Sequence, residues 1–264
     1  RNNENVTVSR AGGWRAKREQ PRKQNPLQED FSVRVPPIPD LPDVNVMFLN
    51  PVGGLALMLA PAITLIFYFL QPGGSFIDAA DPANATETIS ALVSNAALGK
   101  IVSVIIPIGL LSMVYGLFIL QSNIRSAGNG DALSRLAALF VLVGVIGWVI
   151  GSGASLAIIG SGLPVEQAIP VFGSLYSAIL GIGTVSGIMT GIGFLALALA
   201  ISSRDDYNKM MALLAAVAAL VAIAVTIIGG MNTSQLQTMN MISGLTYMVH
   251  MVWFFMLGRS LSKR

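Results

Sequence analysis

Cysteine is absent from the 264 residues of this chain, and histidine occurs once, as His250. Without cysteine the protein can form no disulfide, no thiolate metal site and no cysteine nucleophile. Charged residues are also scarce, because Asp, Glu, Lys and Arg make up 11% of the chain, against roughly 25% in soluble domains. So few charges cannot cover the surface of a water-soluble protein, and we therefore expect an integral membrane protein.

Long apolar segments make up most of residues 50–264, and 53% of the whole chain is hydrophobic. A helix needs about 20 apolar residues to cross the hydrocarbon core of a bilayer. The segments of about this length or longer predict an all-α, polytopic transmembrane helical bundle with six spans. Short connections after the third, fourth and fifth spans predict that these helices are antiparallel neighbours. The predicted spans cover about residues 52–70, 99–121, 134–159, 171–200, 209–230 and 238–258.

Lys and Arg are unevenly distributed between the predicted loops. Fifteen of the 16 basic residues fall in the N-terminal tail, the second and fourth loops and the C-terminal end, and Lys100 is the exception. Because cytoplasmic loops hold the excess of Lys and Arg, we expect a multi-pass protein of the cell (cytoplasmic) membrane with both termini cytoplasmic. An organellar inner membrane is the alternative. The opposite loops carry Asp78, Asp81, Glu87 and Glu166.

Residues 1–49 differ from the bundle, because they are first basic and then rich in proline. They hold no apolar core of a signal sequence, so no cleavable signal peptide is expected there. The prolines favour an extended path, and such a segment builds no core of its own. We predict an extended cytoplasmic tail that docks on a partner subunit, with electrostatic anchoring to anionic lipid as the alternative. The candidate docking residues are Trp14, Pro36, Pro37, Pro39 and Pro42.

The longest predicted loop joins the first two spans and reads QPGGSFIDAADPANATETISALVSN. Asp81-Pro82 predicts a turn, and the residues that follow predict a short amphipathic helix capped by Asp or Asn. Asn84-Ala85-Thr86 also matches a glycosylation sequon, a pattern that is common by chance.

Regularly spaced glycines occur in the fourth span, in the stretch GIGTVSGIMTGIG, and a similar spacing occurs in the third. Small residues separated by three others line one helix face and let a second helix approach closely. We expect these faces to pack within the bundle, with a subunit interface as the alternative for the fourth span. The predicted helix-packing residues are Gly147, Gly151, Gly183, Gly187 and Gly191.

Ionisable side chains are absent from the central part of every predicted span, apart from the single histidine. Proton pumps, ion-coupled transporters and voltage sensors need buried charge that moves or titrates, so these classes are disfavoured. The chain also lacks a second histidine and a carboxylate pair at helical spacing, which acid–base catalysis or a metal site would use. We therefore expect neither enzymatic activity nor a metal site.

His250 lies eight residues before Gly258, which is roughly 12 Å of helix, and so falls within the hydrocarbon zone. One interpretation is axial ligation of a haem or chlorophyll by its imidazole. The other is a neutral histidine that is hydrogen-bonded within the bundle, and the lack of a second histidine favours it. The residues that share its helix face, and that we regard as a candidate cavity face, are Ser243, Thr246 and Tyr247.

From Asn50 to Lys263 the chain resembles uncharacterised six-helix bacterial integral membrane proteins. The likeness rests on ATETISALVSNAALGKI before the second span, LLSMVYGLFIL at its end and LSRLAALFVLVGVIGW at the start of the third. It does not extend to the proline-rich tail. The resemblance implies a six-helix membrane fold and assigns no activity and no site residues.

These observations predict a non-catalytic accessory or structural subunit of a larger membrane protein complex. Its partners would be other membrane subunits, reached through the tail and the glycine-rich helix faces, together with bound lipids, and no nucleic acid. The alternative is a passive binder or conduit for a small apolar molecule such as a lipid, quinone or pigment. In that alternative, Pro61 and Pro107 kink the first two spans, and the helix face with Tyr247 and His250 lines a cavity.

Overall fold

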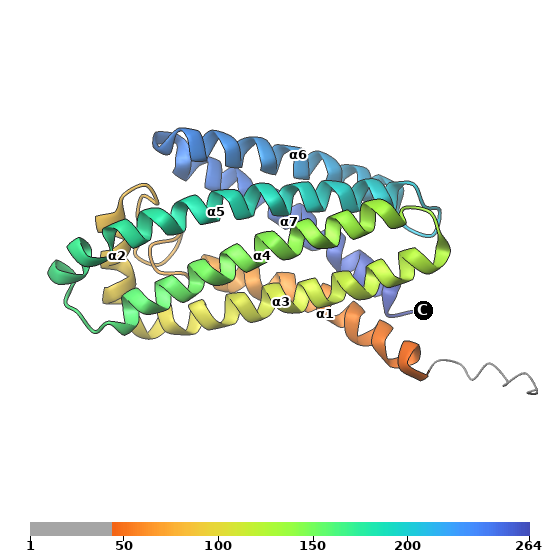
Figure 1. Cartoon of the computed structure of the whole chain (residues 1–264), viewed down its shortest axis with the longest axis horizontal. Helices are drawn as coiled ribbons and strands as arrows, with labels where there is room; N and C mark the ends of the chain where they lie inside the picture. The colour runs from red at the N-terminus through yellow and green to blue at the C-terminus, as the bar shows by residue number, and fades with distance from the viewer. Residues whose placement is uncertain (1–43) are drawn as a thin grey trace, which may run out of the picture. The chain divides into compact units, whose positions relative to one another are not determined.

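The computed structural model describes residues 44–264, and within this range the chain is helical apart from its loops and one isolated bridge. The all-α prediction is confirmed for these residues (Figure 1). The predicted docking residues of the tail, Trp14, Pro36, Pro37, Pro39 and Pro42, lie outside the described residues. The helices are α1 (Val44–Phe69), α2 (Ala85–Ser94), α3 (Ala96–Ala127), α4 (Asp131–Gly160), α5 (Val165–Ser202), α6 (Lys209–Met231) and α7 (Leu236–Leu261), with a 3-10 turn, η1 (Thr233–Gln235), before α7.

Six of these helices, all except α2, are long and apolar enough to cross a membrane. This pattern defines a multi-pass integral membrane protein, and each long helix coincides with one predicted span. The largest difference is at α1, which begins at Val44, eight residues before the predicted start of the first span. The reason is physical: hydropathy marks the part of a helix that lies in hydrocarbon, and a helix can continue beyond that part.

The long helices form a closed ring of neighbours in the order α1, α3, α4, α5, α6 and α7, and α7 returns to α1. The predicted contacts between the third to sixth spans are therefore confirmed, because α4, α5, α6 and α7 are neighbours in sequence order. Figure 1 shows α2 at one end of the bundle and the C-terminus at the other. We refer to these as the α2 end and the C-terminal end.

The short helix predicted between the first two spans is confirmed as α2, and Asn84 caps it. The Asn84 carboxamide accepts hydrogen bonds from the backbone N–H of Thr86 and Glu87 and donates one to the Glu87 carboxylate at 2.7 Å, which satisfies donors at the helix start. On α5, the Tyr176 hydroxyl lies 2.8 Å from the Pro82 carbonyl oxygen. Tyr176 therefore fastens the α2 segment to α5.

Glycines set the close approach of α5 to α4 and to α6. At three of the five predicted packing positions a Cβ atom would lie unusually close to a side chain of the neighbouring helix, so a larger residue there requires that side chain or the helix to shift. The nearest atoms to such a Cβ are Ser186 Oγ for Gly147, Thr226 Cγ2 at 3.0 Å for Gly187, and Ile223 Cγ1 at 2.6 Å for Gly191.

The other two predicted packing glycines have different surroundings. A Cβ at Gly151 would make an ordinary contact, 3.6 Å from Ile179 Cγ2. At Gly183 no atom would lie within 4 Å of it. Gly183 therefore faces open space inside the ring rather than a neighbouring backbone.

Arg204, in the loop between α5 and α6, joins several segments at the C-terminal end. Its side chain donates two hydrogen bonds to the Asp206 carboxylate, at 2.8 and 2.7 Å, and a third to the Asn129 carbonyl oxygen at 3.1 Å. Arg264, which follows α7, donates to the same carboxylate at 2.7 Å. The hydrogen bond from Arg204, with support from Arg264, lowers the pKa of Asp206 to about 2. We call Arg204, Asp206 and Arg264 the Arg204 cluster.

Candidate functional site

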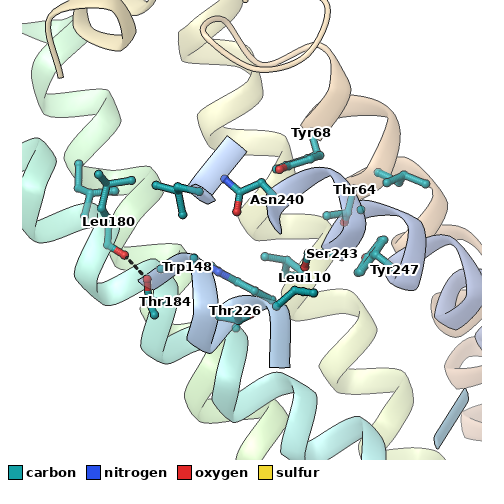
Figure 2. Close-up of a pocket in the computed structure, with 18 residues that line it drawn as sticks. Thr64, Tyr68, Leu110, Trp148, Leu180, Thr184, Thr226, Asn240, Ser243 and Tyr247 are labelled. Atoms are coloured by element: carbon teal, nitrogen blue, oxygen red, sulfur yellow. Dashed lines mark hydrogen bonds between the residues drawn. The ribbon is translucent and has the colours of Figure 1, made fainter. Parts of the chain in front are cut away.

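A cavity of about 340 Å³ lies inside the ring, and all six long helices contribute to its wall (Figure 2). Because the ring is closed, side chains that are distant in sequence meet there. We call it the central cavity. The residues that line it are Thr64, Leu65 and Tyr68 of α1; Leu110 of α3; Trp148 of α4; Ile179, Leu180, Gly183, Thr184 and Gly187 of α5; Val225, Thr226 and Gly229 of α6; and Leu236, Asn240, Ser243, Gly244 and Tyr247 of α7.

The central cavity occupies the part of the ring near the α2 end. Its α1 residues lie at the end of that helix, and its α6 residues also lie in the last turns of α6. On α7 the lining runs from Leu236, at the helix start, to Tyr247, a length of roughly 16 Å at 1.5 Å per residue. The cavity thus extends from one end of the bundle to about the level of Tyr247.

Glycines create much of this space. No atom lies within 4 Å of a Cβ built at Gly183 or at Gly244, and both glycines line the cavity. A Cβ at either position would therefore meet no neighbouring atom, and a larger side chain would take up space beside the cavity. The glycine pattern in α5 therefore serves two purposes: Gly187 and Gly191 bring α6 close, whereas Gly183 leaves a void.

No Asp, Glu, Lys, Arg or His belongs to the lining of the central cavity. Three of its polar groups are threonine hydroxyls, and each donates its proton to a backbone carbonyl one turn earlier in its own helix. These hydroxyls keep lone pairs that can accept a hydrogen bond but have no free proton to donate. The three donations are from Thr64 to Ala60 at 2.8 Å, from Thr184 to Leu180 at 3.0 Å, and from Thr226 to Ala222 at 2.7 Å.

Donors are supplied by other side chains of the lining. Trp148 carries an indole N–H, Asn240 a carboxamide NH₂ and Tyr247 a phenolic O–H. The Tyr247 hydroxyl is buried and has no hydrogen-bond partner among the described residues. A buried hydroxyl without a partner costs about 1–3 kcal/mol, so an acceptor oxygen on a bound molecule would stabilise this arrangement.

Below the cavity, toward the C-terminal end, the ring is filled by large buried side chains. Phe194, Trp253 and Phe254 are at most 4% exposed. Phe194 and Phe254 are in edge contact, with ring centroids 5.0 Å apart, and Trp253 stacks on Phe254 at 5.4 Å. We call this filled region the aromatic core. It closes the central cavity on the side of the C-terminal end.

His250 belongs to this aromatic core. It is 1% exposed, and its ring centroid lies 4.7 Å from that of Phe194. Its Nδ1 lies 2.7 Å from the Thr246 carbonyl oxygen, and because a carbonyl oxygen only accepts, Nδ1 is the donor. Nε2 is buried and has no hydrogen-bond partner among the described residues.

Of the four α7 residues singled out from the sequence, Ser243 and Tyr247 line the central cavity, whereas Thr246 and His250 do not. Thr246 is buried and donates to the Ser243 carbonyl oxygen at 2.7 Å. The geometry of His250 fits a buried, hydrogen-bonded histidine. Ligation of a haem or chlorophyll by His250 stays a prediction, and the central cavity gives it no support.

The sequence interpretation missed most of the lining, including Trp148, Thr184 and Asn240. Trp148 packs partly against the buried core and also lines the cavity. Pro61 and Pro107 lie inside α1 and α3, but neither lines the cavity. The sequence signal that could have pointed to the cavity is its glycines. Helical spacing alone, however, does not distinguish a glycine that faces a void from one that packs against a neighbouring helix.

Comparison with known proteins gives no match to a family model, to a curated protein or to a solved structure. Among residues 44–264, no group of three or more His, Cys, Asp or Glu side chains is placed to hold a metal ion. The central cavity is therefore the feature of the described residues on which a functional proposal can be based.

Proposed function

We propose that this protein binds a small, uncharged, amphiphilic molecule of the membrane in its central cavity. The observation that carries the proposal is the cavity itself, which is lined by all six helices that are long and apolar enough to cross a membrane. Its volume of about 340 Å³ falls within the roughly 300–1,000 Å³ of known ligand pockets. An apolar wall with a few oriented polar groups is also typical of such pockets.

The absence of ionisable groups from the lining supports an uncharged ligand. A charged group in this cavity would need an opposite charge or water to offset its desolvation, and the lining supplies no counter-charge. The threonine oxygens and the Tyr247 hydroxyl can instead pair with neutral hydroxyl or carbonyl groups. These side chains would orient the ligand without carrying out chemistry on it.

The aromatic core favours a binder over a conduit. A conduit needs a path from one end of the bundle to the other, and Phe194, His250 and Phe254 close the ring beyond the cavity. Opening a path would require these packed side chains to separate. Binding in the cavity requires no such rearrangement.

The proposal also includes the orientation of the protein in the membrane. We infer six crossings with both ends of the bundle sequence in the cytoplasm, because the described basic residues other than Lys100 lie at the C-terminal end, and cytoplasmic loops hold the excess of Lys and Arg. The α2 end would then face away from the cytoplasm. A role as an accessory subunit depends on residues 1–43 and on partner proteins, and it stays a prediction.

A pair of glycine substitutions tests ligand binding. Gly183→Leu places a side chain in the cavity, and Gly181→Leu is the matched control, because Gly181 is two residues away, is exposed and has no atom within 4 Å of its Cβ. Each protein would be purified from its native membrane in mild detergent, and bound molecules would be identified by native mass spectrometry and extraction. We expect a neutral amphiphile on the wild type and on Gly181→Leu, and at least tenfold less on Gly183→Leu.

Equal ligand content in the two variants would contradict the proposal, because a filled cavity cannot hold the same molecule. An empty wild-type protein from native membranes would contradict it as well. Reproducible co-purification with larger subunits and without any ligand would favour the accessory-subunit prediction instead.

A further inference from the structure

The contacts of α7 change along its length. Near the α2 end, α7 packs on α6, since a Cβ at Gly229 would lie 3.1 Å from Met239 Cβ. Near the C-terminal end it packs on α1, where Gly258 and Gly54 bring the two backbones together. All the buried residues of α7 lie at or after Thr246. The first half of α7 is therefore held by α6 and is only loosely covered on the side of α1.

The central cavity reaches the molecular surface between these two helices. Tyr68, at the end of α1, lines the cavity and is 42% exposed, and Asn240, in the first half of α7, lines it and is also exposed (Figure 2). A residue that borders the cavity and is also exposed marks an opening. The two residues come from α1 and α7, which are neighbours in the ring.

Apolar side chains are exposed on the outer faces of α1 and α7 near this level. Ile66 of α1 is 56% exposed, and Met241 and Leu245 of α7 are 67% and 62% exposed. A surface of this kind is suited to acyl chains rather than to water. Tyr68 and Asn240 lie within the last and first turns of their helices, where polar groups meet the head-group region.

The volume of the cavity limits what it can enclose. A cavity of about 150 Å³ accepts benzene, and the central cavity, at about 340 Å³, is roughly twice as large. It has room for a one-ring or two-ring head group but not for a long hydrocarbon chain as well. A ligand with such a chain must leave part of itself outside.

We propose that the opening between α1 and α7 is a lateral entrance from the lipid, and that the ligand is a neutral lipid with a compact, oxygen-bearing head group. This rests on the proposed binding function. The head group enters the cavity and accepts a hydrogen bond from the Tyr247 hydroxyl, which is unpartnered and covered in the structure and becomes accessible when the side chains over it move aside. The apolar tail stays outside the cavity, among the surrounding acyl chains.

Fluorescence of Trp148 tests the entrance, because Trp148 lines the cavity. The protein and its Trp148→Phe variant would be placed in vesicles of phosphatidylcholine with brominated or ordinary acyl chains, and the difference between the two proteins isolates the Trp148 signal. We expect brominated chains to lower this signal at least twofold and aqueous iodide to lower it by less than about a tenth, because the entrance faces acyl chains. Quenching by iodide, or by neither agent, would overturn the lateral entrance.

Substitutions on α7 test whether acyl chains reach the cavity through the opening between α1 and α7. Asn240→Phe narrows the proposed entrance, and Gln237→Phe is the control, because Gln237 is exposed on the same helix and does not line the cavity. We expect Asn240→Phe to remove most of the quenching by brominated chains and Gln237→Phe to leave it unchanged. Equal quenching in both variants would place the entrance elsewhere. These results require no bound ligand, so failure of the entrance and failure of binding are separate outcomes.

The position of the head group is tested with a decyl-tailed 1,4-benzoquinone, a neutral probe with two acceptor oxygens. Its affinity can be measured by quenching of Trp148. We expect Tyr247→Phe to weaken binding about 3- to 10-fold, the usual effect of one lost hydrogen bond, and Tyr115→Phe, at an exposed position of α3, to have no effect. Equal affinities of the Tyr247→Phe variant and the wild type would overturn the proposed hydrogen bond.

Discussion

The two ends of the helical ring use the same residue type, glycine, for opposite purposes. At the C-terminal end, a Cβ at Gly258 would overlap the Gly54 carbonyl oxygen and lie 2.8 Å from Met58 Cγ, so glycine there allows α1 and α7 to touch. Toward the α2 end, Gly183 and Gly244 face no atom within 4 Å, and their missing side chains leave the central cavity. Whether a glycine closes a gap or creates one depends on what the fold places opposite it.

The two ends also differ in how firmly their segments are held by polar contacts and burial. At the C-terminal end, Arg204 is buried and links the loops after α3 and α5 with the residue after α7, through Asp206. Toward the α2 end, the first half of α7 has no buried residue. The contacts at the C-terminal end thus hold the ring together, whereas the sparse packing of α7 near the α2 end leaves room for a ligand to enter.

The largest difference in stability is expected between two leucine substitutions, one at a glycine near each end of the ring. Gly258→Leu forces α1 and α7 apart, and overpacking of this kind costs about 3 kcal/mol. Gly183→Leu enters open space and should leave stability unchanged or slightly raised. Thermal unfolding of both variants in mild detergent measures the effect, and similar losses in both would show that the two ends are packed alike.

Removal of the Arg204 guanidinium should have the next largest effect on the free energy of unfolding. In Arg204→Met the Asn129 carbonyl oxygen loses its donor and the Asp206 carboxylate keeps only Arg264, which we expect to cost about 2 kcal/mol after allowance for the partial exposure of Asp206. Lys209→Ala is the control, because the Lys209–Asp205 ion pair is exposed and should contribute no measurable stability. Unfolding midpoints that fall equally in both variants would contradict a structural role for the cluster.

Lowering the pH should remove the contribution of the Asp206 carboxylate to the free energy of unfolding, which is smaller than that of Arg204. The Arg204 hydrogen bond lowers the pKa of Asp206 from 3.8 to about 2, so the folded protein binds this proton less readily than the unfolded chain does. The resulting stability is present above about pH 4 and is lost as the pH falls through 2. Because the side chain of Asp206 is 37% exposed, we expect about 1 kcal/mol or less.

Unfolding of the wild type and of Asp206→Asn between about pH 6 and pH 2 measures this contribution. The wild type should be more stable at the higher pH, and the two should converge toward pH 2. A difference that persists unchanged at pH 2 would show that the carboxylate charge is not its source.

The sequence was sufficient for the membrane class and for the positions of the long helices, because both depend on runs of apolar residues. It also predicted α2 and its cap, since Asp81-Pro82 and Asn84 act on adjacent residues. It did not predict the Arg204 cluster, whose members are separated by up to 60 residues along the chain. Nor did it distinguish Ser243 and Tyr247, which line the cavity, from His250, which shares their helix face.

By itself the sequence determined what each segment is: an apolar helix, a charged loop or a capped turn, because these properties depend on neighbouring residues. Only the tertiary structure decided which side chains face one another. The closure of the ring places Trp148, Thr184, Asn240 and Tyr247 around one void and buries His250 in the aromatic core. A cavity is a property of what is missing between several helices, and no single segment contains that information.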